Sequence, residues 1–491
     1  MNIALLIIFG FLGLSIYLGI MAQKGKEMSL EQWTVGGRGF GTIFIFLLMA
    51  GELYTTFTFL GGSGWAYGKG GPTFYMLTYG SIAYVISYWL LPAIWKYAKK
   101  HKLMSQADFF VNKYKSPFLG IVVAIVGVVA LIPYLILQLK GLGIIVSEAS
   151  YGLISSTAAI WIGVIAVTIY VMISGIHGSA WTAVIKDIMI LGIVVFLGIY
   201  LPFHYYGGFQ PMFEAIELTK PGFLALPDSG LSVSWFISTV LLTAMGYYMW
   251  PHTFGSIYSA QNAKVFRKNA IIMPVYQIVL LSVFFVGFAA ILQVKGLEGA
   301  DMDLSLLRLS MQTFDPWVVG IIGAAGLLTA IVPGSMILMA TATLLSKNVY
   351  KVFVPTASDQ QIAKLAKNLV PVVAIIALIF TFKGGDTLVS LLLMGYSLVT
   401  QLFPALVFSL AKKNFVTKQG AASGIIAGVA TVAYVTISGT TIGTIFPSLP
   451  QFLKDLNVGV VALIINLVVT IIVSVVTASS SSIEKANENI A

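Results

Sequence analysis

One carboxylate lies in the middle of an apolar stretch of this chain, where an ionisable group is out of place. Glu52 falls within 40–67, and the residues 49–64 around it include four glycines and three threonines. Each glycine weakens a helix by about 1 kcal/mol relative to alanine, and an ionisable group at a bilayer centre costs about 3 kcal/mol or more. A membrane protein keeps such a stretch only where its backbone is buried or lines a cavity. We therefore predict an unwound, polar pocket at Gly51–Gly64, with a tightly packed, glycine-rich helix contact as the alternative.

A second irregular stretch, 244–252, places a group of aromatic residues between Gly246 and Pro251. Proline has no N–H, so a carbonyl one turn earlier is left free. This stretch predicts a second break, with an interfacial aromatic belt as the alternative. Paired interruptions at matching places in two halves of a chain are typical of the midplane site of a secondary transporter.

The elements that must hold these residues are membrane-spanning helices. Of the 491 residues, 58% are hydrophobic and 9% are charged, and the mean hydropathy is +0.94. Stretches of about 20 apolar residues, enough to cross a bilayer core of about 30 Å, recur along the whole chain and give about thirteen candidate spans. We expect an all-α integral membrane protein with a single transporter domain over 1–491. The predicted spans are 2–22, 40–67, 73–96, 117–148, 152–174, 183–203, 232–252, 270–293, 317–346, 366–383, 387–411, 420–439 and 457–478.

The two irregular spans are the second and the seventh, five helices apart. We therefore predict two five-helix repeats, about 40–203 and 232–411, that are inverted in the membrane because five is odd. Each repeat begins with a discontinuous helix. The helices 2–22, 420–439 and 457–478 are additions to this core.

Charge and composition restrict the function further. Basic residues follow alternate spans, as in 96–102, 264–268 and 412–418, which predicts a plasma-membrane protein with its N-terminus outside and its C-terminus in the cytoplasm. This bias accounts for the net charge of +10, so a nucleic-acid partner is not expected. Without cysteine or a histidine ligand spacing, no metal site is expected beyond one for sodium. The sequence shows no nucleophile–base pair and no phosphate-binding loop, so an enzyme is not expected. No cofactor other than the coupling ion is expected, and no obligatory protein partner is evident.

Five segments resemble a known family over nearly the whole chain. They read FLGGSGWAY at 59–67, MSQADFF at 104–110, YLILQLKGLG at 134–143, SGIHGSAWTAVIKD at 174–187 and LSKNVYK at 345–351. In this order they are similar to the sodium/solute symporter family, and spans two and nine resemble its monocarboxylate permease branch. The resemblance implies the thirteen-helix, leucine-transporter-like architecture and cation-driven uptake of a small organic solute.

The resemblance also implies where a sodium ion would bind. Backbone carbonyl ligands fall on Gly51, Tyr54 and, on the ninth span, near Thr329. The pair of hydroxyl side chains expected on that span falls on Val332-Pro333, and neither residue coordinates through its side chain. Thr329 and Ser335 lie one turn to either side as substitutes; otherwise the sodium site is degraded or the coupling ion is different.

Proton coupling is the alternative to sodium, because ionisable residues inside a membrane are candidates for function. Glu52 lies in the break, and Lys140 lies about 15 Å inside its span at 1.5 Å per residue, unless it snorkels to an interface. The resemblance makes Asp187 a waypoint for the departing cation, with a simple pair to Lys186 as the alternative. An uncoupled facilitator for the same solutes also stays open.

The solute is expected beside the breaks, where exposed helix N-termini favour an anionic group. Monocarboxylates and amino acids both fit the hydroxyl groups there. The sequence thus predicts a symporter that imports such a solute on a sodium gradient. The candidate solute-binding residues are Thr55, Thr56, Thr58, Tyr75, Tyr79, Tyr247 and Gln401.

Overall fold

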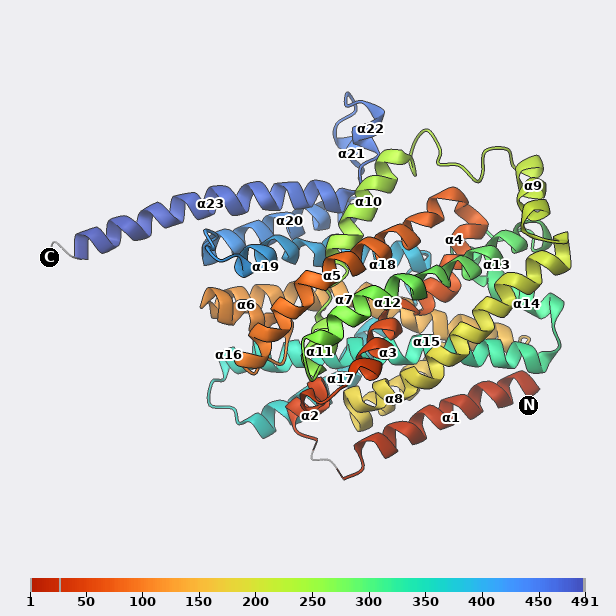
Figure 1. The fold of residues 1–491 in the computed structure, drawn as a ribbon, viewed down its shortest axis with the longest axis horizontal. Helices are drawn as coiled ribbons and strands as arrows, with labels where there is room; N and C mark the ends of the chain where they lie inside the picture. Colours follow the sequence, from red (N-terminus) through yellow and green to blue (C-terminus); the bar gives the residue numbers. More distant parts are fainter. Residues whose placement is uncertain (1, 26–27, 489–491) are drawn as a thin grey trace.

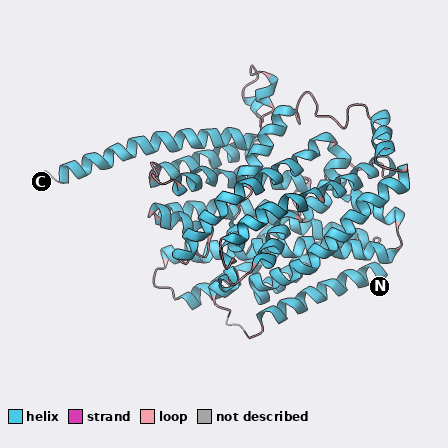
Figure 2. Ribbon diagram, in the orientation of Figure 1, coloured by secondary structure: helices cyan, strands magenta, loops and turns pink. Residues whose placement is uncertain are grey.

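The structure is a computed structural model that describes residues 2–25 and 28–488, and every regular element in this part is helical (Figures 1 and 2). Ten helices of this part are long and apolar enough to cross a membrane, or eleven if a bent pair forms one span. The long helices pack side by side and run mostly from left to right in Figure 1. The all-α membrane class predicted from the sequence is therefore confirmed.

The long helices fall close to the predicted spans. Their bounds are α1 (Ile3–Gln23), α5 (Tyr75–Lys100), α7 (Pro117–Ala149), α8 (Ser156–Tyr206), α12 (Lys264–Ile278), α13 (Leu280–Gln293), α15 (Pro316–Thr343), α17 (Asp359–Thr381), α18 (Leu388–Val399), α19 (Phe403–Leu410), α20 (Lys418–Ser438) and α23 (Val458–Glu488). Shorter helices lie between them: α2 (Leu30–Val35), α6 (Gln106–Tyr114), α9 (Phe209–Thr219), α14 (Ser305–Thr313) and the π-helix η5 (Leu344–Tyr350).

The first predicted break is present. Helix α3 (Thr42–Leu53) ends before Tyr54, and the chain resumes as the π-helix η2 (Phe57–Gly61) and α4 (Gly62–Lys69) at a bend of 48°. The Thr58 hydroxyl stabilises the break because it donates to the carbonyls of Leu53 and Thr55, at 2.9 and 3.0 Å. We call residues 54–56 the first break.

The second predicted break lies in the seventh span. Helix α10 (Val233–Gly246) ends where predicted, and α11 (Pro251–Ser259) begins at the proline. Trp250 precedes it with extended backbone angles, φ −66° and ψ 132°, so the helical hydrogen bonds do not run through. Helix α11 packs against α3 and α15, which brings the second break beside the first.

Helix α8 contains two of the predicted spans, 152–174 and 183–203, in 51 residues. Gly175 interrupts it with φ 51° and ψ −147°, angles that favour glycine. The hydroxyls of Tyr170 and Thr182 lie 2.8 Å apart, although twelve residues of straight helix would span about 18 Å. The chain therefore folds back at Gly175. The total of thirteen spans stays a prediction, since the length criterion alone gives ten or eleven.

Helix α15 is the central helix of the bundle, and nearly all of its side chains from Val319 to Thr343 are buried. Close approach depends on its glycines: a Cβ on Gly320 would lie 2.8 Å from the Ala4 Cα of α1, and one on Gly326 would lie 2.8 Å from the Phe59 ring. Small residues let membrane helices pack closely in this way. Both breaks are thus held against a rigid neighbour.

Candidate functional site

Glu52 connects the two breaks. Its carboxylate accepts a hydrogen bond from the Thr253 hydroxyl at 2.7 Å and another from the Ser256 hydroxyl at 2.6 Å. Both donors lie on the first turns of α11, directly after Pro251. Hydrogen bonds to an ionised group are about twice as strong as neutral ones. The predicted carboxylate therefore holds the end of α3 against the beginning of α11.

A buried ion pair lies on the other side of the first break. Lys186 and Asp187 come from the second half of α8, with side chains 0% and 5% exposed, and their charged atoms are 2.8 Å apart. The Lys186 ammonium also donates to the Tyr54 carbonyl at 3.2 Å, and the Tyr276 hydroxyl donates to Asp187 at 3.4 Å. Asp187 thus forms the pair with Lys186 that was the alternative from the sequence, and Lys186 joins it to the break; its role as a waypoint for the cation stays a prediction.

The sodium ligands implied by the family resemblance are assembled only in part. Gly51 and Tyr54 lie at the break, and a Cβ on Gly51 would be 3.4 Å from a Val332 methyl group and 3.5 Å from the Lys186 ammonium. The Thr329 hydroxyl donates to the Gly326 carbonyl. The described residues beside the break therefore do not form the expected ring of oxygen atoms.

Ser335, the second expected substitute, is also engaged elsewhere. Its hydroxyl donates to the Val332 carbonyl at 2.7 Å and pairs with the Ser179 hydroxyl of α8 at 2.6 Å. It thus joins α15 to α8, and its hydrogen bonds within the described part of the chain do not involve residues 54–56.

The three threonines of the first break have different partners. Thr58 and Thr55 stabilise the break itself, since the Thr55 hydroxyl accepts from the Phe57 N–H at 3.1 Å. The Thr56 hydroxyl instead donates to the Gln138 side chain of α7 at 2.8 Å. All three side chains are buried, and their role in solute binding stays a prediction.

A cluster of buried tyrosines lies between the breaks and one end of the bundle. We define this aromatic cluster as Tyr75, Tyr79, Tyr84, Tyr247 and Tyr396. Its members come from α5, the second break and α18, with ring centroids 5.6–6.1 Å apart in the contacting pairs. The Tyr84 and Tyr247 hydroxyls are 3.2 Å apart. Tyr75, Tyr79 and Tyr247, predicted from the sequence, are thus brought together.

Trp65 separates the aromatic cluster from a large cavity. Its ring contacts those of Tyr75 and Trp235, at 5.7 and 5.8 Å between centroids, and its indole N–H reaches the Thr387 hydroxyl at 3.5 Å. On its other side lies a cavity of about 530 Å³ whose lining includes Lys69 and Lys220. Trp65 thus lies between the cavity and the aromatic cluster.

Two predicted residues lie away from this site. Lys140 donates to the carbonyls of Gly384 and Asp386, at 2.7 and 3.1 Å, near the end of the bundle. Gln401 hydrogen-bonds the Gly459 carbonyl at 3.1 Å and accepts from Asn466 at 3.2 Å, so it ties α18 to α23. The hydrogen bonds of both side chains, among the residues that the structure describes, are therefore made away from the breaks.

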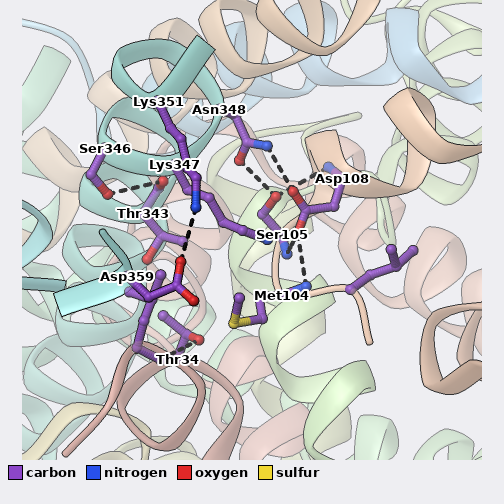
Figure 3. A network of polar contacts seen from close by, with 12 residues as sticks. Thr34, Met104, Ser105, Asp108, Thr343, Ser346, Lys347, Asn348, Lys351 and Asp359 are labelled. Atoms are coloured by element: carbon purple, nitrogen blue, oxygen red, sulfur yellow. Dashed lines mark hydrogen bonds and ion pairs between the residues drawn. The ribbon is translucent and has the colours of Figure 1, made fainter. Parts of the chain in front are cut away.

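The opposite end of the bundle is closed by a polar network (Figure 3). Asp108 of α6 pairs with the Lys347 ammonium and accepts from the Asn348 amide at 2.8 Å, while Ser105 donates to Asn348 at 2.7 Å. We call Ser105, Asp108, Lys347 and Asn348 the latch. Burial raises the pKa of Asp108, but the Lys347 ammonium and the hydrogen bonds outweigh it and hold the pKa below its usual value.

The latch leaves little space beneath it. The cavity between it and α11 measures about 20 Å³ and is lined by residues that include Ser105, Pro251 and Thr343. Such a volume holds about one water molecule. The molecule is therefore closed at the latch end, while the large cavity lies at the other end.

Sequence reasoning missed several residues of the site. Lys186 was considered only as a partner for Asp187, although two adjacent charges inside an apolar stretch are a signal of their own. Thr253 and Ser256 are spaced three residues apart after Pro251 and so share one helix face. Tyr276 carries no signal in the sequence.

Known proteins resemble this chain over nearly its full length. A family model described as the sodium:solute symporter family matches residues 33–428. The uncharacterized symporter YhjB of Bacillus subtilis (strain 168) is 72% identical over 482 residues, 98% of this chain and 99% of that protein. A monocarboxylate transport permease protein of Rhizobium johnstonii is 29% identical over 435 residues, 87% of this chain and 86% of that protein.

A solved structure has a similar fold. The substrate-bound, outward-open state of a Na+-coupled sialic acid symporter matches with a TM-score of 0.77 and 17% identity, and the match covers 97% of this chain and 98% of that chain. At this identity the likeness shows the fold alone, and it confirms the leucine-transporter-like class expected from the sequence.

Proposed function

Because this chain belongs to the sodium:solute symporter family, we propose that it imports a small monocarboxylate by secondary active symport. A cation gradient drives the uptake, and sodium is the ion that family membership favours. Proton coupling and uncoupled facilitation are the alternatives. The protein is a multi-pass membrane protein, and we propose the plasma membrane as its location.

The observation that carries this proposal is the contact of Glu52 with α11. One partly buried carboxylate joins two discontinuous helices, so a change at either break is transmitted to the other. Discontinuous helices of this kind form substrate and ion sites near the middle of the membrane. Coupling between solute and ion requires such a shared element.

Two features favour a carboxylate as the solute. The Tyr75 hydroxyl is buried and, among the described residues, has no hydrogen-bond partner, so it is free to donate to an anion. Lys69, Lys220 and Glu298 line the cavity beyond Trp65, so its charged lining is positive by one charge, and positive groups at a cavity mouth raise the local concentration of anions. The monocarboxylate permease among the relatives supports the same solute class.

The test is uptake of radiolabelled acetate, propanoate, pyruvate, lactate and proline by proteoliposomes containing the purified protein. Sodium and pH gradients are imposed separately. We expect one or more of the monocarboxylates to accumulate above its equilibrium level with at least one gradient. Equilibration without accumulation would indicate a facilitator, and absence of uptake for the four monocarboxylates other than proline, whether or not proline is taken up, would refute the solute class.

A variant tests the role of Glu52. We expect Glu52→Gln to reach the membrane normally but to lose accumulation, because a neutral amide weakens both hydrogen bonds to α11. Glu148→Gln is the matched control, since Glu148 pairs with Arg308 at 3.3 Å far from the breaks. Normal accumulation by Glu52→Gln would remove this residue from the mechanism.

We also propose that the latch end faces the cytoplasm, with the N-terminus outside. Because the chain contains no cysteine, single introduced cysteines report topology cleanly. A cysteine in the exposed segment 226–230 should react with an impermeant thiol reagent added to intact cells, and one in 355–358 should not. The reverse pattern would invert the orientation.

A further inference from the structure

The first break leaves the C-terminal end of α3 inside the bundle. The last carbonyls of a helix have no intrahelical partner and carry partial negative charge, so this end favours a cation. The Leu53 carbonyl accepts from the Thr55 N–H and the Thr58 hydroxyl, at 3.2 and 2.9 Å. The Tyr54 carbonyl has a cationic partner instead, the Lys186 ammonium at 3.2 Å.

Lys186 meets the requirements of a buried ammonium. Its side chain is fully buried, and a charge in such a place must be paired and hydrogen-bonded. Asp187 supplies the counter-charge at 2.8 Å, and Tyr54 supplies the neutral acceptor. The Tyr276 hydroxyl donates to Asp187 and orients it. The backbone carbonyl of Tyr276 in turn accepts a hydrogen bond from the Tyr54 hydroxyl at 3.1 Å.

The surroundings of the ammonium suit a lysine better than a metal ion. Within the described residues, its hydrogen bond and ion pair are with one carbonyl and one carboxylate. The Cβ position of Gly51 that lies 3.5 Å from the ammonium also lies 3.4 Å from a methyl group of Val332, which offers no lone pair. Hard metal ions take about six oxygen ligands, whereas an ammonium has three N–H donors and no need of a ring.

We propose that the Lys186 ammonium is the resident cation of the first break and takes the place that a sodium ion would occupy at the Tyr54 carbonyl. This inference rests on the proposed function and deepens it, because it specifies the cation of that site. Family membership implies sodium at the break, and the residues present do not fit it. Of the coupling ions that the proposed function leaves open, this inference selects the proton, so the solute is carried without sodium.

Chemical rescue tests the proposal without any transport assay. Lys186→Ala removes three methylenes and the ammonium, a volume that propylammonium matches. Purified full-length variant is heated in detergent with the chloride of propylammonium, sodium or potassium, and with propan-1-ol as the uncharged analogue. A ligand that binds only the folded protein raises its melting temperature.

We expect Lys186→Ala to have a lower melting temperature than the wild type. Propylammonium should raise this temperature towards the wild-type value, and propan-1-ol should not. Lys113→Ala is the matched control, since Lys113 donates to the Ser409 carbonyl at 2.9 Å outside the break. No rescue by propylammonium, or equal rescue of the control, would overturn the proposal.

Wild-type protein provides a second measurement in case the alanine variant does not fold. Monocarboxylate uptake into proteoliposomes is measured under a pH gradient, with all sodium replaced by choline. We expect the initial rate to stay within about twofold of the rate with sodium, whereas a fall of about tenfold, equivalent to ~1.4 kcal/mol, would overturn the inference. If no monocarboxylate is taken up under any gradient, the proposed function fails, and the rescue experiment still decides the role of Lys186.

Discussion

Breaking the latch should open the closed end of the bundle by a predictable amount. Asp108 and Lys347 are 13% and 19% exposed, so their pair is nearly buried. Removing one partner of a fully buried pair costs about 3–5 kcal/mol. With a discount for partial exposure, we expect Asp108→Asn to cost about 2–3 kcal/mol, which changes an open-to-closed ratio by about 30- to 150-fold.

The assay uses the absence of cysteine from the chain. Thr343→Cys places a single thiol in the cavity of about 20 Å³ beneath the latch, which is too small for a thiol reagent. The labelling rate therefore reports the open fraction, and Asp108→Asn should raise it by about 30- to 150-fold, the ratio given by ~2–3 kcal/mol. The wild-type rate with the same cysteine is the reference.

A second ion pair in the same region serves as the control. Lys351 and Asp359 are 2.9 Å apart, but Asp359 is 92% exposed, and exposed pairs contribute about 0–1 kcal/mol. Asp359→Asn should therefore change the labelling rate by no more than about fivefold, the effect of ~1 kcal/mol. Equal rates for both variants would refute the argument that burial gives the latch its strength.

The latch should also respond to pH in one direction. Because the folded protein holds the pKa of Asp108 below its usual value, the latch stabilises the closed end fully above the unfolded pKa of about 3.9. That contribution is lost as pH falls through the lower, folded pKa. Labelling, normalised to free cysteine at each pH, should stay slow from about pH 5 to 8 and rise only in acid below the unfolded value; a rise near neutral pH would contradict this.

Three further substitutions test the site. Ser256→Ala removes a donor to the partly buried Glu52 carboxylate and should cost about 1.5–3 kcal/mol, measured as thermal stability against Ser259→Ala, whose hydroxyl donates to the backbone of α11; equal losses would contradict the bridging role. Gly175→Ala forces a residue with a side chain to adopt φ 51°, which costs about 1–3 kcal/mol of stability. The yield of folded protein in size-exclusion chromatography should therefore fall. A normal yield would argue against the reversal of the chain at Gly175. Trp65→Ala should raise KM for uptake more than it lowers kcat, because Trp65 stands between the cavity and the aromatic cluster; an unchanged KM would remove this role.

Much of the fold could be predicted from the sequence because the membrane makes hydropathy informative. Glu52 among glycines and Pro251 after Gly246 predicted both breaks, since each feature is costly in an uninterrupted helix. The reversal at Gly175 was read as a boundary between two spans, and the structure supports that reading with the Tyr170–Thr182 contact. Side-chain partners across the bundle were not accessible in this way.

The site was predicted less well, for physical reasons that differ between residues. Depth along a span does not determine direction, so Lys140 was expected near the break although its ammonium lies at Gly384. The Gln401 amide donates a hydrogen bond to a backbone carbonyl of α23. Only the packed structure shows that this carbonyl needs a donor. Lys186 was overlooked because a pair with its neighbour Asp187 was enough to explain its charge. Its contact with Tyr54 joins residues 132 positions apart in the chain, and the sequence does not indicate it.

Because the chain reverses at Gly175, a rotation of the second half of α8 about this residue would displace the side chains farther along the helix. Lys186 lies eleven residues beyond this glycine, about 16 Å away at 1.5 Å per residue. A swing of only about 10° around Gly175 would therefore carry the ammonium about 3 Å, enough to separate it from a carbonyl that it now touches. The backbone angles of one buried glycine about 16 Å from Lys186 can thus govern whether the charge is engaged, because a small rotation there becomes a larger displacement of the ammonium.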